Sequence, residues 1–309
     1  MLSHRAVHLT GRVPLYYEDL DPGHGERPPI VMVHGGGFTG SCYLSTPDGR
    51  AGWAHDFLRH GYRVIVPDWP GVGRSAAFPS DDVTGEIVAE ALGALLVHLG
   101  TPIVLLVHSM SGPYGFRVVE EHPDLVRALV AVAPGPPGNI QPAPPILRET
   151  DTHIEIASPS MNLVIPKRGR WSPTEQFARQ KLVGTSKRFF PEDLHALIAA
   201  TAPIPVGCLL GRLNYEGRQL SVHRKDKFTG LPCLVVTGSD DADHPRHTDR
   251  ATADWLRELG TDVDYHFLSD HGISGNGHML MSEDNSSEVA DHIANWVAVA
   301  LPAGQDITA

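Results

Sequence analysis

The sequence is poor in cysteine and has no long apolar run. Three of its 309 residues are cysteines, and Cys42, Cys208 and Cys233 lie too far apart in the chain to predict a disulfide framework or a cysteine-based metal site. No run approaches the roughly 18 apolar residues that a membrane span needs. The first 25 residues also lack the apolar region of a signal peptide. These absences predict a cytoplasmic protein without a membrane partner.

Positive charge is scarce as well. The chain has 25 lysines and arginines against 36 aspartates and glutamates, a formal net charge of -11, so we expect it to repel nucleic acid and anionic lipid. It has no Gly-Lys-Ser/Thr phosphate loop and no His-Glu-x-x-His metal motif, and its 18 histidines are scattered. The sequence therefore predicts a small-molecule partner and neither a metal nor an organic cofactor. It does not fix the oligomeric state, for which a homodimer is one expectation.

Apolar runs of strand length alternate with helical patterns in the first half of the chain. After two strands around Gly11, such runs occur at 30–34, 62–68, 102–108 and 128–134. Continuous apolar runs are typical of parallel strands that are buried on both faces. The alternation of strands and helices predicts a mostly parallel sheet with helices on both sides.

A helix is expected between the second and third of these runs. Apolar residues recur at helical spacing from Val83 to Leu99. We expect Asp81 and Asp82 to cap its start and Gly100 to end it.

The chain changes character after residue 134. The stretch 135–145 is rich in proline, and from there to residue 229 the sequence shows helical patterns but no strong strand. The buried-strand pattern then resumes and alternates with helical patterns to the end of the chain. We therefore predict an α/β fold with a mostly parallel eight-stranded sheet, built from residues 1–134 and 230–309. A helical lid, residues 135–229, is inserted after the sixth strand.

Three motifs follow predicted strands, and ligand sites in open α/β sheets lie beyond the carboxyl ends of strands. The first motif is VHGGGFTG, residues 33–40. Consecutive glycines expose backbone N–H groups, so Gly36 and Gly37 can donate hydrogen bonds to a developing oxyanion. The alternative is a glycine-rich turn without a chemical role.

The second motif is HSMSG, residues 108–112, between a buried strand and a helical pattern. A nucleophile elbow requires this strand–turn–helix context, and its strained turn exposes a serine hydroxyl. Ser109 comes directly at the strand end and is the predicted nucleophile, whereas Ser111 fits a small packing residue. The N–H of Met110 is a further candidate oxyanion donor. The glycines usual in this turn are missing, since Val107 and Ser111 occupy the flanking positions.

The third motif is GNGHM, residues 275–279, after the last predicted strand. A nucleophilic serine needs a base that titrates near neutral pH, and histidine has the right pKa. His278 is the predicted base, and its place after the serine in the chain is the order found in hydrolases with this elbow. His271 is the competing base because it lies nearer the strand end.

In this kind of site an acid orients the histidine. Three candidates, Asp240, Asp241 and Asp243, follow the predicted strand that ends before Gly238. The spacing from Gly238 to Asp241 to Pro245 is common at this acid position. We favour Asp241 over Asp240, and Asp240 over Asp243. The alternative for each is a solvated aspartate in a turn.

Four side chains near these motifs are candidate walls of a substrate pocket: Phe38, Cys42, Trp69 and Tyr114. Packing in the core is an equally good interpretation for them. Cys42 lacks an elbow of its own, so we do not expect it to act as a nucleophile.

Together, the motifs HGGG, DWPGVGRS, HSMSG and GNGHM in this order resemble those of the α/β-hydrolase superfamily. More narrowly, TPDGRAGWA (46–54), HSMSGPYG and the C-terminal stretch from GNGHM resemble the Alcaligenes-esterase-like branch. In that branch a β-branched residue often precedes the His-Ser pair, as Val107 does here. The resemblance also implies a glutamate acid directly after the strand before the lid, where this sequence has Ala133. Either Asp241 has taken that role or the triad is incomplete.

The motifs and the resemblance predict a serine hydrolase that cleaves a carboxylic ester or lactone of a small to medium organic molecule. Ser109 would attack the carbonyl, His278 would move the proton, and Asp241 would hold the histidine tautomer. Thioesterase, amidase and lyase activities stay open because one fold supports them all. A ligand-binding protein without hydrolytic activity stays open because of Ala133.

Overall fold

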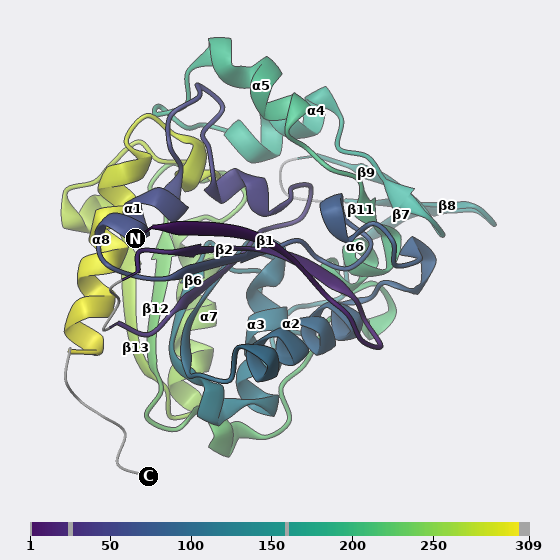
Figure 1. The fold of residues 1–309 in the computed structure, drawn as a ribbon. Coiled ribbons are helices and arrows are strands. Elements are labelled where there is room, and N and C mark those ends of the chain that lie inside the picture. The colour runs from purple at the N-terminus through teal and green to yellow at the C-terminus, as the bar shows by residue number, and fades with distance from the viewer. Residues whose placement is uncertain (1, 24–26, 158–160, 303–309) are drawn as a thin grey trace.

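The computed structural model describes residues 2–23, 27–157 and 161–302. An eight-stranded sheet with the order β1-β2-β4-β3-β5-β6-β12-β13 forms its centre (Figure 1). Strands from β4 to β13 in this order pair in parallel, and β1 and β2 pair antiparallel at one edge. The predicted sheet is thereby confirmed. Its strands are β1 (Ser3–Leu9), β2 (Leu15–Asp21), β3 (Ile30–Val33), β4 (Val64–Pro67), β5 (Ile103–His108), β6 (Val126–Val132), β12 (Pro232–Thr237) and β13 (Asp262–Phe267).

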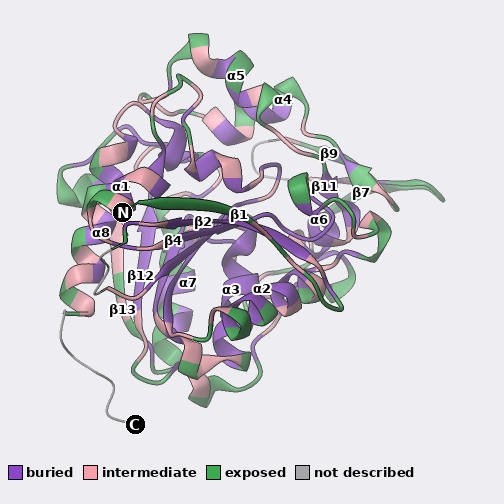
Figure 2. Cartoon of the chain, viewed as in Figure 1, coloured by how far each residue is buried: buried purple, intermediate pink, exposed green. Residues whose placement is uncertain are grey.

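Helices cover both faces of this sheet. Every residue of β3, β4 and β5 is buried, as expected for strands with helices above and below. Helices α1 and α8 lie on one face, and α2, α3 and α7 lie on the other (Figure 1). Figure 2 shows the resulting pattern, with buried residues along the sheet and exposed residues on the outer helix surfaces. The helices are α1 (Trp53–Arg59), α2 (Gly85–Leu99), α3 (Gly112–Glu121), α7 (Arg246–Glu258) and α8 (Ser286–Ala300).

Helix α2 ends as expected but begins differently. Gly100 adopts the left-handed conformation, with a φ of 63°, that favours glycine at a helix end. Asp81 and Asp82 lie in a separate 3-10 turn, and the residue before the helix is Thr84, so the predicted aspartate cap was wrong. Asp81 instead accepts a hydrogen bond from the backbone N–H of Gly169, at 2.7 Å, and so ties this turn to a segment 88 residues away in sequence.

The segment 135–229, called the insertion below, is not purely helical, and that part of the prediction was wrong. A three-stranded sheet β7-β8-β9 projects from the body of the molecule (Figure 1), and β10 and β11 form a second small sheet. These strands are two to four residues long, and all of β7 is exposed. Buried and more exposed residues alternate in β8 and β9, so these strands lack the burial along their whole length that reveals core strands in a sequence.

The elements of the insertion are β7 (Ile146–Glu149), β8 (His153–Ile156), β9 (Leu163–Pro166), β10 (Arg170–Trp171), α4 (Glu175–Phe177), α5 (Leu194–Ala199), β11 (Ile204–Pro205) and α6 (Val206–Arg212). A π-helical turn, Ala178–Val183, continues directly from α4. Helices α4 and α5 lie beyond the sheet, on the side of its carboxyl-terminal strand ends (Figure 1).

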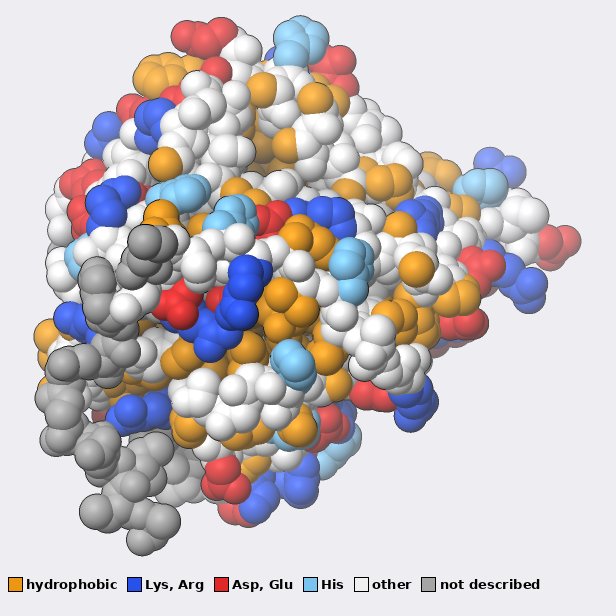
Figure 3. Space-filling view, in the orientation of Figure 1, with side chains coloured by type: hydrophobic (Ala, Val, Ile, Leu, Met, Phe, Trp, Pro, Cys, Tyr) orange, Lys and Arg blue, Asp and Glu red, His pale blue; other side chains and the backbone are white. Residues whose placement is uncertain are grey.

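Charged side chains of both signs are interspersed over the face drawn in Figure 3. Within the described residues, no helix has both the length and the apolar character needed to cross a bilayer.

Candidate active site

The carboxyl ends of β3 and β5 lie side by side at the centre of the sheet. The chain leaves β3 toward β4 on one side and returns to β5 on the other, which makes this a topological switch point. The glycine motif follows β3, and Ser109 follows β5. The fold therefore brings the first two predicted motifs to one crevice, although about 70 residues separate them in sequence.

Ser109 occupies a strained turn between β5 and α3. Its φ is 52°, in the left-handed region that is unfavourable for residues other than glycine. Strain of this kind costs on the order of 1–3 kcal/mol and concentrates at functional sites. The backbone carbonyl of Ser109 accepts a hydrogen bond from the N–H of Gly135 at 2.8 Å, which helps to hold the turn. The predicted strand–turn–helix context is present.

The structure explains how the turn tolerates Val107 in place of the usual glycine. A Cβ added to Gly115, on α3, would lie 2.7 Å from Cγ1 of Val107. A Cβ on Gly112 would lie 2.8 Å from the carbonyl oxygen of Gly135. Room for close packing at the elbow therefore comes from two glycines on the following helix. Both stood in the printed sequence, but sequence reasoning missed their part in this packing.

Ser111 is buried and held by two hydrogen bonds. Its hydroxyl donates to the carbonyl oxygen of His34 at 2.6 Å and accepts from Nε1 of Trp69 at 3.1 Å. Its position fits the packing residue that we predicted, and it also connects the elbow to the end of β3.

His278 lies between Ser109 and Asp241. Its Nε2 is 2.9 Å from Oγ of Ser109, and its Nδ1 is 2.8 Å from Oδ2 of Asp241. The other oxygen of Asp241 accepts backbone N–H bonds from Asp243 and His244, at 2.9 and 3.0 Å. Burial raises the pKa of Asp241, but the charge of His278 and its hydrogen bond outweigh burial and bring the pKa below its usual value. The carboxylate is thus ionised at neutral pH, as an acceptor for an Nδ1–H group must be.

The competing residues bond other partners. Asp240 pairs with Lys187 at 2.8 Å, and Asp243, although it lines the same pocket, pairs with Lys181 at 2.8 Å. His271 packs against two other histidines, His266 and His292. The structure therefore brings Ser109, His278 and Asp241 together and leaves these alternatives out.

Ala133 lies directly after β6 and is fully buried, with a φ of 42°. Its N–H donates to the carbonyl of Val236 in the neighbouring strand β12. Because β6 and β12 pair in parallel, their carboxyl ends lie at the same edge of the sheet. An acidic residue that follows β6 and one that follows β12 therefore both lie near this edge. Asp241, which follows β12, bonds His278 although position 133 has no acid.

Two further histidines flank His278, and the sequence analysis did not assign them a role. The ring of His244 stacks on His278 at a centroid distance of 5.0 Å, and the ring of His108 lies at 4.9 Å. His108 Nε2 donates to the backbone carbonyl of His278 at 3.1 Å, and His244 bonds Asp249 through Nδ1 at 2.8 Å. Burial lowers the pKa of His108 well below its usual value. The imidazole of His278 is thus fixed from both sides.

One trio at this site has metal-binding atoms close together: Asp243, His244 and His278, each offering an atom within 4.8 Å of the others. Two of these side chains already have strong partners, because His278 bridges Ser109 and Asp241 while Asp243 pairs with Lys181. A cation there would have to displace those contacts.

The glycine motif closes tightly against the elbow. A Cβ added to Gly36 would lie 1.9 Å from Sδ of Met110, so a larger residue would collide. Gly36 and Met110 both line the pocket that contains Ser109. Gly37 turns toward the insertion, where its carbonyl accepts a hydrogen bond from the N–H of Ala202 at 2.8 Å. Of the three predicted oxyanion donors, Gly36 and Met110 therefore lie at the pocket wall.

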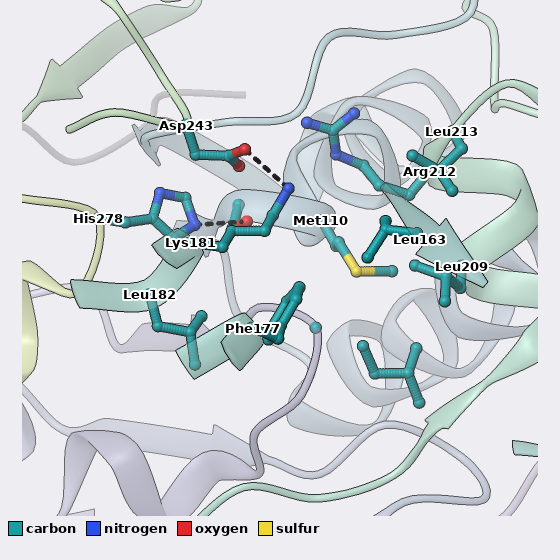
Figure 4. Close-up of a pocket in the computed structure, with 13 residues that line it drawn as sticks. Met110, Leu163, Phe177, Lys181, Leu182, Leu209, Arg212, Leu213, Asp243 and His278 are labelled. Atoms are coloured by element: carbon teal, nitrogen blue, oxygen red, sulfur yellow. Dashed lines mark hydrogen bonds and ion pairs between the residues drawn. The ribbon is translucent and has the colours of Figure 1, made fainter. Parts of the chain in front are cut away.

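The pocket at Ser109 is mostly apolar and is walled largely by the insertion (Figure 4). The volume of this cavity is about 30 Å³. The insertion contributes Leu163, Phe177, Lys181, Leu182, Ile204, Leu209, Arg212 and Leu213, and the rest of the chain contributes Gly36, Ser109, Met110, Asp243 and His278.

Phe38, Cys42, Trp69 and Tyr114 do not line this pocket, so the prediction that they form its walls was wrong for this pocket. All four are buried in the hydrophobic core. Trp69 stacks on His34 at 4.6 Å and meets Tyr114 edge-on at 5.3 Å. The insertion, whose contribution the sequence did not reveal, supplies most of the pocket wall instead.

One stretch of the insertion, residues 181–188, fastens the loops that carry Asp241 and His278. We call it the strap. Lys181 pairs with Asp243, as Figure 4 shows, and the hydroxyl of Thr185 donates to the carbonyl of Asp240 at 2.7 Å. On the other loop, the N–H of Lys187 donates to the carbonyl of Gly275 at 2.8 Å. Burial raises the pKa of Asp243, but the charges of Lys181 and His244 hold it well below its usual value.

Comparison with known proteins shows the family of this chain. Residues 30–292 match the alpha/beta hydrolase family. The chain therefore belongs to that family, and its relatives support hydrolase activity. A novel bacterial esterase has a similar structure, with a TM-score of 0.57 and 20% identity over 97% of this chain and 94% of the other.

Individual relatives carry several activities. A probable secreted lipase, phiG, from a fungal species is 27% identical over 342 residues, covering 92% of this chain and 85% of the relative. A 2-hydroxy-6-oxo-6-phenylhexa-2,4-dienoate hydrolase from Burkholderia cepacia is 32% identical, but over 43% of this chain and 42% of the relative. A mutant of the N-acyl homoserine lactonase AidH with N-hexanoyl homoserine has a TM-score of 0.61 at 19% identity, covering 99% and 100% of the two chains. The two solved structures show the shared fold alone.

Proposed function

We propose that this protein is a serine hydrolase that cleaves a carboxylic ester or lactone through an acyl-enzyme intermediate. The observation that carries the proposal is the continuous hydrogen-bonded chain from Ser109 through His278 to Asp241, at 2.9 and 2.8 Å. The left-handed φ of Ser109 supports it, because this strained turn presents the hydroxyl at the sheet edge.

In the proposed reaction, Oγ of Ser109 attacks the substrate carbonyl while Nε2 of His278 takes the hydroxyl proton. The buried carboxylate of Asp241 stabilises the imidazolium that forms. In this proposal the backbone N–H groups of Gly36 and Met110, two residues of the pocket wall, donate hydrogen bonds to the oxyanion. His278 then protonates the leaving alcohol oxygen, and a water molecule hydrolyses the acyl-enzyme by the same route in reverse.

The pocket walls favour an apolar acyl or alcohol group of modest size. Leucines, a phenylalanine and an isoleucine dominate the wall, and the free space at its centre is small. A larger substrate therefore requires side chains of the insertion to move, and we propose that the insertion acts as a lid. A thiol nucleophile is disfavoured, since Cys42 is buried outside the pocket and burial raises the pKa of its thiol.

The test is covalent labelling combined with turnover. The wild-type protein should react with a fluorophosphonate probe and show an acyl burst with a short-chain nitrophenyl ester. Ser109→Ala should abolish labelling and lower kcat by roughly 10⁴-fold or more. Ser111→Ala is the matched control, because it removes the neighbouring serine and should leave labelling intact. Unchanged labelling and turnover in Ser109→Ala would refute the proposal.

A further inference from the structure

Three histidines from separate segments meet on the side of the molecule formed by β13 and α8. His266 lies on β13, His271 on the 3-10 turn that follows, and His292 on α8. Their ring centroids are 4.0, 5.0 and 5.1 Å apart. In the sequence they are spaced by 5 and 21 residues, which resembles no metal motif, so only folding brings them together.

The nitrogen atoms of this trio are close to the spacing that a metal ion requires. Nδ1 of His266 is 2.9 Å from Nε2 of His292, and one nitrogen from each of the three rings lies within 4.8 Å of the others. A tetrahedral zinc ion binds imidazole at about 2.0–2.1 Å, which places neighbouring ligand nitrogens about 3.3 Å apart. The facing nitrogens of His266 and His292 are already near that distance. The third, His271, is exposed on a turn and can close the remaining gap by a small side-chain movement.

Metal-binding imidazoles must be neutral, with one ring nitrogen free of its proton. In this trio, Nδ1 of His266 already faces Nε2 of His292. The contact between the two facing nitrogens is an N–H···N hydrogen bond, and a metal ion replaces the shared proton when the ring tautomer changes.

We propose that His266, His271 and His292 form a binding site for a divalent late first-row transition metal, with Zn²⁺ as the ion of choice and water in the fourth position. Imidazole is a good ligand for Zn²⁺, Ni²⁺ and Cu²⁺, whereas Mg²⁺ and Ca²⁺ prefer oxygen ligands. The carboxylate of Glu288, one turn before His292 on α8, acts electrostatically on that ring.

The site lies where a cation would act as a staple. It joins the last strand, the final helix and the start of the loop that leads from His271 to His278. A bound ion therefore stabilises the folded state, because ions that bind the folded chain alone shift the unfolding equilibrium. This role differs from that of a metal at Asp243, His244 and His278, where binding would block the proton transfer from Ser109.

The experiment measures Zn²⁺ binding to the purified full-length chain by equilibrium dialysis with elemental analysis, and by titration with Co²⁺ as a spectroscopic probe. We expect one ion per chain, a visible absorption typical of tetrahedral Co²⁺, and a higher Tm with Zn²⁺. His271→Ala and His292→Ala should each weaken binding about tenfold or more and remove the shift in Tm. His195→Ala, which removes an exposed histidine on α5, is the matched control and should bind as the wild type does.

Three results would overturn the proposal. The first is a stoichiometry below one ion per chain in the wild type at saturating Zn²⁺. The second is equal binding by wild type and His271→Ala. The third is binding that is lost in His278→Ala but kept in His292→Ala, which would place the ion at the candidate active site instead. Because Ser109→Ala leaves the trio intact, it should bind Zn²⁺ normally whether or not the protein is a serine hydrolase.

Discussion

The α/β core and the insertion contribute to the candidate active site in different ways. The core supplies the proposed reacting groups, which follow strands β3, β5, β12 and β13 at one edge of the sheet. The insertion supplies most of the pocket wall and the strap that fastens the loops of Asp241 and His278. The chemistry and the shape of the site thus come from two regions with different sequence signals.

The difference reflects how each region is stabilised. Core strands are buried on both faces and must be apolar along their whole length. The insertion uses short strands and brief helical turns whose side chains are partly exposed. Its apolar residues join the same hydrophobic core as the sheet, but they are spread over these short elements, so no long periodic run marks them in the sequence. The pocket wall is therefore harder to recognise from the sequence than the proposed catalytic groups below it.

The largest expected effect concerns the core. Asp241→Asn keeps the shape of the side chain but removes the charge that stabilises the imidazolium, and it favours the wrong tautomer of His278. We expect kcat for ester hydrolysis to fall by roughly 10⁴-fold. Asp240→Asn is the matched control, since that carboxylate pairs with Lys187 instead of His278. Steady-state kinetics on a nitrophenyl ester would separate the two variants, and equal small effects from both would remove Asp241 from the triad.

The second effect concerns the strap. Lys181→Met leaves the carboxylate of Asp243 without its cation, and 4% of that aspartate side chain is exposed. Removing one partner of a buried ion pair costs about 3–5 kcal/mol, so the free energy of unfolding should fall in denaturant titrations. Because the strap also shapes the pocket, we expect a higher KM. A variant with wild-type stability and KM would show that the strap does not depend on this pair.

The same ion pair predicts a pH dependence. The folded pKa of Asp243 lies below its unfolded value of about 3.9. Its stabilising contribution is therefore complete above that unfolded value and is lost as the pH falls through the folded pKa. The stability gap between wild type and Lys181→Met should be constant near neutral pH and should narrow below about pH 4. Thermal unfolding at a series of pH values measures this gap, and a gap that widens in acid would contradict the argument.

The smallest effect concerns packing under the elbow. In Gly115→Ala the new methyl group would lie 2.7 Å from Val107, and overpacking of this kind costs about 1–3 kcal/mol. We expect a lower Tm in calorimetry. The double variant Gly115→Ala with Val107→Ala should regain stability relative to the sum of the two single changes. Strict additivity of the single changes would show that the two residues do not share this space.

How far the sequence predicts the site depends on the range of the interactions involved. Ser109 was predictable because its position is set by its neighbours, the end of β5 and the start of α3. The base and the acid were narrowed to a few candidates by strand ends. The spacing from Gly238 to Pro245 favoured Asp241 over Asp240, and only the structure shows that Asp241 bonds His278 while Asp240 pairs with Lys187. The pocket wall was not predicted, and the four side chains chosen for it belong to the core.

The sequence by itself determined the order of the core elements and the turn that strains Ser109, because burial on both faces and a strand–turn–helix junction are read over a few neighbouring residues. The tertiary structure decided which acid meets His278, which residues wall the pocket and which histidines gather at β13 and α8. Those contacts join segments that are tens to hundreds of residues apart. Their geometry depends on how β6, β12 and the insertion pack together, and no local pattern in the chain encodes it.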